Sequence, residues 1–207
     1  MLIRFNRSSA VRAAYALYDR GEYSNVIKFC TAKLEEPGAD PELRLLRGVA
    51  YLDRGKPNEA VADWETCCQD PHLAGVAHYY LGNFLSMKSA EHEAAAWDHY
   101  VRAVECGWVE GHIGKGNMLL ERAMVCKEEE RHDDAVKQLR DAVTELTAGI
   151  GSPAPASRRR ALNIRGDVHF HLNDTAARLR DRAEENALPA FDPAQTDPRA
   201  TGQELYS

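Results

Sequence analysis

The stretch RGVAYLDRGKPNEAVADW, residues 47–64, contains the pattern that decides the fold. Apolar residues recur at helical spacing before Gly55 and again after Pro57. Glycine ends helices because it tolerates left-handed backbone angles, and proline suits a first helical turn because an N–H there would have no helical partner. The stretch therefore predicts two short helices joined by a tight turn.

The same pattern recurs every 34 residues. The central glycine of the quoted stretch is Gly48, and Gly82 and Gly116 follow it at that interval, each inside a similar segment. One interval earlier lies Ala14 in an apolar segment. A single helical hairpin cannot bury its apolar face alone, so the repetition indicates a stack of hairpins. Because helix-forming residues also outnumber strand-forming ones, we expect an all-α fold.

The repeat resembles a known family. A small residue in the first helix, a glycine in the turn and an alanine four residues before an aromatic residue in the second helix resemble the tetratricopeptide repeat (TPR). The resemblance covers about residues 8–147. It implies a right-handed α-solenoid of four to five helical hairpins whose first helices line a concave face. A TPR fold specifies the architecture much better than the function.

The repeat predicts the organisation of the chain. We expect a repeat array over residues 8–147, a linker or long loop over 148–157 because that segment is rich in Gly, Pro and Ser, a degenerate hairpin that caps the array over 158–186, and a flexible tail over 187–207. The expected units of the array are 8–39, 40–73, 74–108 and 109–147.

Two units depart from the regular length. Gly82 and Ala96 are two residues further apart than Gly48 and Ala60, which predicts a longer turn near residues 86–91. In the fourth unit the corresponding distance, from Gly116 to Ala135, is seven residues longer. Seven residues are about two helical turns, so the apolar face is kept. We therefore expect elongated helices near residues 117–129 that protrude from the array.

Composition narrows the classes of function. The net charge of −6 disfavours nucleic acid as a partner, since binding to phosphates needs a basic face. No apolar run is long enough for a membrane span, and the first residues lack the apolar segment of a secretory signal. The five cysteines have no CxxC spacing, which disfavours a disulfide framework or a zinc knuckle. We expect a cytoplasmic protein with free thiols.

Motifs that carry chemistry are not found in the sequence. The glycine-rich segment 111–116 lacks the spacing of a phosphate-binding loop, and His92-Glu93 lacks the second histidine of a zinc-protease helix. His169 and His171 are expected on different sides of one helix, which suits metal binding poorly. We therefore expect a protein that is not an enzyme and that has no cofactor and no metal.

The TPR resemblance instead predicts a groove that binds another protein. Trp64, Trp97 and Tyr100 fall on the apolar stripe of second helices and are expected in the core. Asn83 and Asn117 follow their repeat glycines, where an amide side chain can hold the backbone of an extended peptide. The residues expected to line the groove are Tyr15, Tyr18, Val49, Leu52, Tyr79, Asn83, Asn117 and Leu120.

The leading hypothesis is a non-enzymatic adaptor that binds a peptide or helix of a partner protein on the concave face. The TPR sub-type that grips chaperone C-termini is disfavoured, because Val11 and Leu45 stand where its lysines are expected. Residues 150–207 carry eight Arg and eight Asp or Glu, so the whole charge of −6 belongs to the earlier residues and favours a neutral or basic guest.

The alternative hypothesis is a structural subunit of a fixed complex or homo-oligomer. It would use the convex face, the elongated fourth hairpin or the tail. Two charged segments bear on it, the acidic residues near 127–134 and the three arginines at 158–160. The sequence leaves the oligomeric state and the identity of the partner open.

Overall fold

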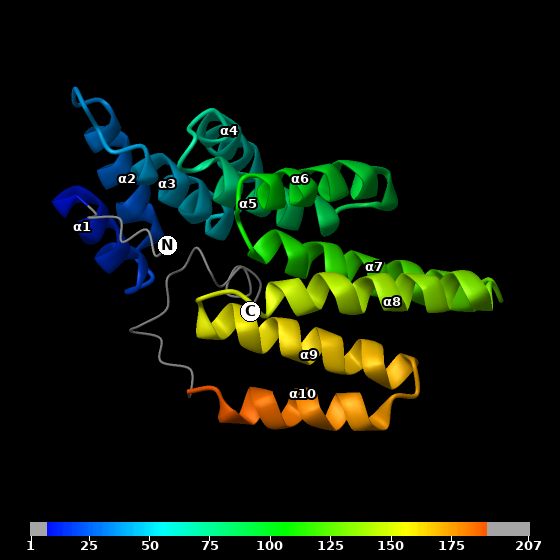
Figure 1. Cartoon of the computed structure of the whole chain (residues 1–207). Helices are drawn as coiled ribbons and strands as arrows, with labels where there is room; N and C mark the ends of the chain where they lie inside the picture. The colour runs from blue at the N-terminus through cyan, green and yellow to red at the C-terminus, as the bar shows by residue number, and fades with distance from the viewer. Residues whose placement is uncertain (1–7, 190–207) are drawn as a thin grey trace. The chain divides into compact units, whose positions relative to one another are not determined.

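The computed structural model describes residues 8–189 of the chain. Within this range the secondary structure is helical and includes no strand, so the predicted all-α class is confirmed (Figure 1). The helices are α1 (Ser9–Tyr18), α2 (Tyr23–Leu34), α3 (Glu42–Asp53), α4 (Pro57–Cys67), α5 (Ala74–Ser86), the short 3₁₀ helix η1 (Ala90–His92), α6 (Glu93–Glu105), α7 (Glu110–Glu128), α8 (His132–Gly149), α9 (Pro155–His171) and α10 (Thr175–Ala187).

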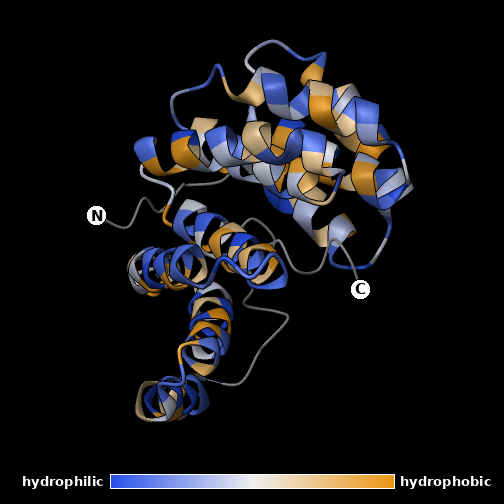
Figure 2. Ribbon diagram, turned by 90° about the vertical axis from the view of Figure 1, so that its right-hand side faces the viewer, coloured by the Kyte–Doolittle hydropathy of each residue, from blue (hydrophilic) through white to orange (hydrophobic). Residues whose placement is uncertain are grey.

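The chain forms two compact units, and the boundary between them falls inside α5. Unit 1 contains the described residues up to Leu81, and unit 2 begins at Gly82. In unit 1, α3 packs against α1, α2 and α4. In unit 2, α7 packs against α6, α8 and α9, and α9 also packs against α10. Most helices carry both hydrophobic and hydrophilic residues, as expected for helices that bury one face (Figure 2).

Four hairpins share one turn geometry. Shortly after the first helix, one residue adopts a positive φ, and the N–H of the next residue donates to the carbonyl five positions earlier, at 2.8–3.1 Å. This arrangement satisfies carbonyls at the end of the helix. Glycine provides the positive φ in two turns and other residues in two: Gly21 (72°), Gly55 (68°), Glu130 (59°) and Asn173 (59°). The hairpin α5–α6 has the longer predicted turn, which contains η1.

The repeat glycines let a large side chain of the same hairpin approach closely. A Cβ atom at Gly48 would lie 2.5 Å from Trp64 Nε1, which is far inside contact distance. Tyr100 lies in the same way against the second repeat glycine, and Leu146 against the third. The glycines at 34-residue intervals are therefore required by packing against the second helix.

An ion pair repeats at the same level of three hairpins. A cation directly precedes the repeat glycine, or Gly166 in the last hairpin, and its acidic partner lies on the second helix. The pairs are Arg47–Asp63 at 2.7 Å, Lys115–Glu145 at 2.5 Å and Arg165–Asp181 at 2.5 Å. The partners are 16, 30 and 16 residues apart. The hairpin α9–α10 thus repeats the geometry of α3–α4, as its sequence suggested.

The hairpin α7–α8 is longer than predicted. Its helices have 19 and 18 residues, whereas α3 and α4 have 12 and 11. In the hairpin α3–α4, Ala60 lies four residues before Trp64, the side chain that packs on the repeat glycine. In α7–α8 that side chain is Leu146, so the residue equivalent to Ala60 is Ala142 and not Ala135. The extra length is therefore about two turns in each helix. The predicted protrusion is visible in unit 2, where α7 and α8 extend past the end of α6 (Figure 1).

Half of the predicted linker over 148–157 is helical. Helix α8 continues to Gly149 and α9 begins at Pro155, which leaves only residues 150–154 as a connection. Proline is favourable at the start of a helix, so its presence here marks a boundary and not a loop. The expected hairpin over 158–186 is present as α9 and α10. Beyond Pro189 the expected tail lies outside the described residues.

Two of the three arginines at the start of α9 form ion pairs with the end of α10. Arg158 lies 3.6 Å from Glu184, and Arg159 lies 3.8 Å from Glu185. Arg159 also donates to the carbonyl of Pro189 at 2.8 Å. The C-terminal carbonyls and acids of α10 therefore offset the unfavourable position of cations at the N-terminus of α9.

None of the helices within residues 8–189 combines the length and the apolar composition that a bilayer crossing requires.

Candidate functional site

Most of the predicted groove residues of unit 1 belong to its core. Tyr15, Tyr18, Val49 and Tyr79 are 6%, 8%, 3% and 1% exposed, and Leu52 is half-buried. The hydroxyl of Tyr15 donates to Glu42 Oε1 at 3.0 Å. The expected exposed aromatic surface is therefore not present in the described part of unit 1, because four of these side chains pack inside the unit.

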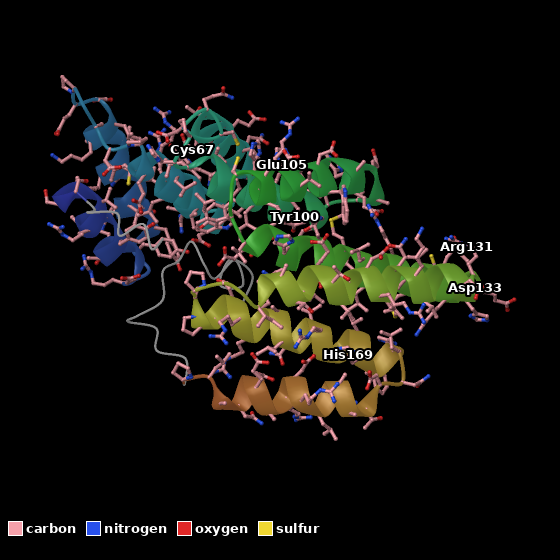
Figure 3. All side chains as sticks on the ribbon, viewed as in Figure 1. Cys67, Tyr100, Glu105, Arg131, Asp133 and His169 are labelled. Carbon is pink, nitrogen blue, oxygen red and sulfur yellow. The ribbon has the colours of Figure 1, made fainter. Side chains whose placement is uncertain are left out.

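The predicted groove residues of unit 2 are also engaged within the chain. Asn83 is 5% exposed, and its Oδ1 accepts a hydrogen bond from Tyr100 at 2.8 Å. Asn117 and Leu120 are half-buried, and Asn117 donates to Glu121 at 2.8 Å. Tyr100 points into the interior of the unit (Figure 3), as predicted for a core residue. The eight predicted residues are divided between the two units, with five in unit 1 and three in unit 2.

A cleft of about 440 Å³ opens in unit 2 instead. Its wall comes from the end of α5, the turn with η1, the start of α6 and one face of α7, with Arg131 at the tip and Gln138 from α8. The lining includes the apolar side chains of Met118 and Val125, and Val125 is 49% exposed. An exposed valine beside a cavity can be covered by a guest at little cost to the fold.

The cleft exists because neighbouring hairpins differ in length. The two additional turns of α7 and α8 extend past α6 and the turn before it. On the other side of α7 and α8, the 17-residue helix α9 packs against both, and Lys127 of α7 contacts His171 of α9. The extension is therefore covered on one side, and the cleft lies on its other side.

Two cations of the cleft are already paired. Arg122 forms an ion pair with Glu93, and its guanidinium lies 4.6 Å from the centre of the Trp97 ring. Arg131 contacts Glu129 and Asp134 at the exposed tip of the hairpin, where Figure 3 labels it. These carboxylates balance most of the positive charge that the two arginines bring to the cleft.

Two hydrogen-bond acceptors of the cleft have no positively charged partner among the described residues. Gln138 Oε1 is buried and has no hydrogen-bond partner in the structure. Glu121 receives one hydrogen bond, from Asn117, and forms no ion pair. Neighbouring atoms displace part of the water around the carboxylate of Glu121. This loss of water and the repulsion from Glu93 raise the pKa of Glu121, although much of its side chain stays exposed. A guest that brings a donor would satisfy Glu121.

Chemical groups outside the cleft are sparse. Among residues 8–189, no three His, Cys, Asp or Glu side chains are close enough to hold a metal ion. Cys68 Sγ lies 3.5 Å from Nδ1 of the buried His78 in unit 1, a contact that the sequence did not single out. Burial raises the pKa of Cys30 and of Cys67 to about 12, so these two thiols stay protonated at neutral pH.

The sequence reasoning missed the cleft residues Glu121, Val125 and Gln138. The signal that could have found them was present, because two adjacent hairpins differ in length and a longer hairpin beside a shorter one leaves an uncovered face. Comparison of the chain with protein-family models, with curated proteins and with solved structures finds no match.

Proposed function

We propose that the protein is a non-enzymatic adaptor that binds a peptide or helix of another protein, and that the cleft of unit 2 holds part of this guest. The observation that carries the proposal is the open 440 Å³ cleft with apolar, charged and unpaired polar groups in its wall. Helical repeats provide rigid surfaces for protein binding, and the turns, glycines and ion pairs shared by the hairpins support a repeat architecture. We further propose a right-handed TPR-like solenoid in the cytoplasm.

The wall of the cleft suits a side chain better than a flat protein surface. Val125 offers apolar contact, while the polar groups around it can fix the orientation of a guest. Four of the five predicted groove residues of unit 1 are buried. We therefore assign the binding of the guest to the cleft of unit 2 and not to the tyrosines of unit 1.

Affinity capture from the native host tests the proposal with two matched variants. Val125→Asp places a charge in the apolar wall of the cleft, and Val136→Asp makes the same change on α8, at a side chain that is 37% exposed and does not line the cleft. We expect a partner that the unchanged protein and Val136→Asp retain and Val125→Asp loses. Equal retention by all three proteins, or the lack of any reproducible partner, would contradict the proposal.

The alternative, a subunit of a fixed complex, has one observation in its favour. Phe170 and Leu179 of the hairpin α9–α10 are 56% and 62% exposed, and Arg178 lies 4.8 Å from the centre of the Phe170 ring. Large exposed apolar side chains often mark a contact between proteins. Light scattering decides this case, because self-association through this hairpin would give a dimer mass that Phe170→Glu reduces to a monomer mass.

A further inference from the structure

The unpaired groups of the cleft define what its guest must bring. Gln138 Oε1 is a buried acceptor without a donor, and Glu121 is a carboxylate without a cation. Gln138 Oε1 is left unsatisfied in the wall, and Glu121, which lines the cleft and is exposed, favours a guest with N–H groups because it has no cation of its own.

The charges around the cleft agree with a cationic guest. Arg122 and Arg131 have carboxylate partners of their own. Lys88 is exposed and lies 4.6 Å from the centre of the Phe84 ring, where water still solvates it. The charged residues that line the cleft are Lys88, Arg122 and Arg131 beside Glu93 and Glu121, and the carboxylates of Glu129 and Asp134, which pair with Arg131 outside the lining, bring the local count to four carboxylates and three cations. Residues 1–149, which include the whole cleft, carry the entire net charge of −6.

The apolar part of the wall selects among cations. Val125 provides apolar surface for a hydrocarbon chain one helical turn from Glu121. Arginine and lysine side chains combine a three- or four-carbon stem with a charged donor at the end, and they place the stem on apolar surface when the head finds an acceptor. A metal ion or a small amine would leave this surface uncovered.

We propose that the cleft holds an arginine or lysine side chain of the partner protein, with its stem on Val125 and its head donating to the carboxylate of Glu121. This inference rests on the proposed function and deepens it by naming the chemistry of the guest. An arginine fits best, because its planar fork can donate to two acceptors at once.

Titration of the full ¹⁵N-labelled chain with three amino-acid amides tests the inference. The probes are N-acetyl-arginine amide, N-acetyl-norleucine amide and N-acetyl-glutamate amide, which share a backbone and differ in the charge of the side chain. We expect saturable shifts of the backbone signals of residues 118–126 and of Gln138 with the arginine probe, and weaker or no shifts with the other two. Stronger binding of the glutamate probe, or equal binding of the norleucine probe, would overturn the inference.

Two variants assign the effect to the carboxylate. Glu121→Gln keeps the shape and removes the charge, so affinity for the arginine probe should fall about tenfold, the usual effect of a lost charged hydrogen bond. Glu128→Gln makes the same change on α7 outside the cleft and should leave affinity unchanged. Unchanged affinity in Glu121→Gln, with a native spectrum, would contradict the proposed contact.

The failure of this inference differs from the failure of the proposed function. If the arginine probe does not bind but Val125→Asp still abolishes partner capture, the cleft binds a partner through other chemistry and only the present inference falls. If no partner depends on Val125 at all, the adaptor proposal falls, whatever the probe does.

Discussion

Replacement of Gly48 by alanine tests the packing that defines the repeat. A Cβ atom at this position would lie 2.5 Å from Nε1 and 2.8 Å from Cδ1 of Trp64, about 1 Å inside ordinary contact distance. Trp64 has no room to retreat. It is 0% exposed, its indole N–H donates to the carbonyl of Leu45 at 3.3 Å, and its ring stacks on Tyr80 at 5.4 Å.

The expected magnitude follows from two opposing terms. Alanine is better than glycine inside a helix by about 1 kcal/mol. Overpacking of a filled core costs about 1–3 kcal/mol, and the rigid ring puts this site at the upper end. We therefore expect Gly48→Ala to lose about 2 kcal/mol of stability in unit 1.

Gly166→Ala is the matched control. Gly166 occupies the equivalent position of α9, but a Cβ atom there would have no other atom within 4 Å. Only the better helix propensity of alanine therefore acts, and the free energy of unfolding should rise by about 0.5–1 kcal/mol. Hydrogen exchange read by mass spectrometry reports each hairpin separately. We expect faster exchange in α3–α4 for Gly48→Ala and slower exchange in α9–α10 for Gly166→Ala. Slower exchange in both would refute the account of the repeat glycine.

Three further predictions concern charged groups and thiols. Asp63→Ala leaves the half-buried guanidinium of Arg47 without its carboxylate partner, although the contact with Thr31 remains, and should destabilise unit 1 by about 2 kcal/mol in urea unfolding, with Asp63→Asn losing less. The thiols of Cys30 and Cys67, with pKa about 12, should stay unlabelled by iodoacetamide at pH 8 while the exposed Cys106 reacts, as peptide mass spectrometry can show. Folding raises the pKa of Glu121 above 4.5, so the folded protein binds this proton more tightly than the unfolded chain does. The stability of the protein therefore falls as the pH rises from 4.5 through the raised pKa. Glu121→Gln should remove this loss of stability, as thermal melts at a series of pH values can show.

The sequence predicted the parts of the fold that short-range chemistry controls. Glycine at position 55 and proline at 57 determine the turn and the start of α4, and just before α3 the side chain of Asp40 accepts a hydrogen bond from Glu42 N–H at 3.0 Å. The glycines at 34-residue intervals were recognised, and the structure adds their physical cause, which is the approach of Trp64 and its equivalents.

The candidate site could not be predicted in the same way, because it depends on contacts between helices. Asn83 and Asn117 hold the same repeat position, yet one bonds Tyr100 of the facing helix and the other bonds Glu121 of its own helix. In the fourth hairpin, the alignment on Ala135 assigned seven extra residues, although the packing adds about two turns to each helix. The sequence predicted the greater length of the fourth hairpin, but the residues that line the cleft follow only from the register in which α7 and α8 pack.

A partner that binds in the cleft of unit 2 comes within reach of a crosslinker at position 125. A photoreactive p-benzoylphenylalanine at position 125, compared with the same residue at position 136, tests this binding most directly in the native host. The account predicts an adduct at 125 whose attached partner segment contains arginine or lysine, and loss of that adduct when Glu121→Gln is added. An adduct of equal yield at 136, or one at 125 that is insensitive to Glu121→Gln and lies in a segment without basic residues, would contradict the account.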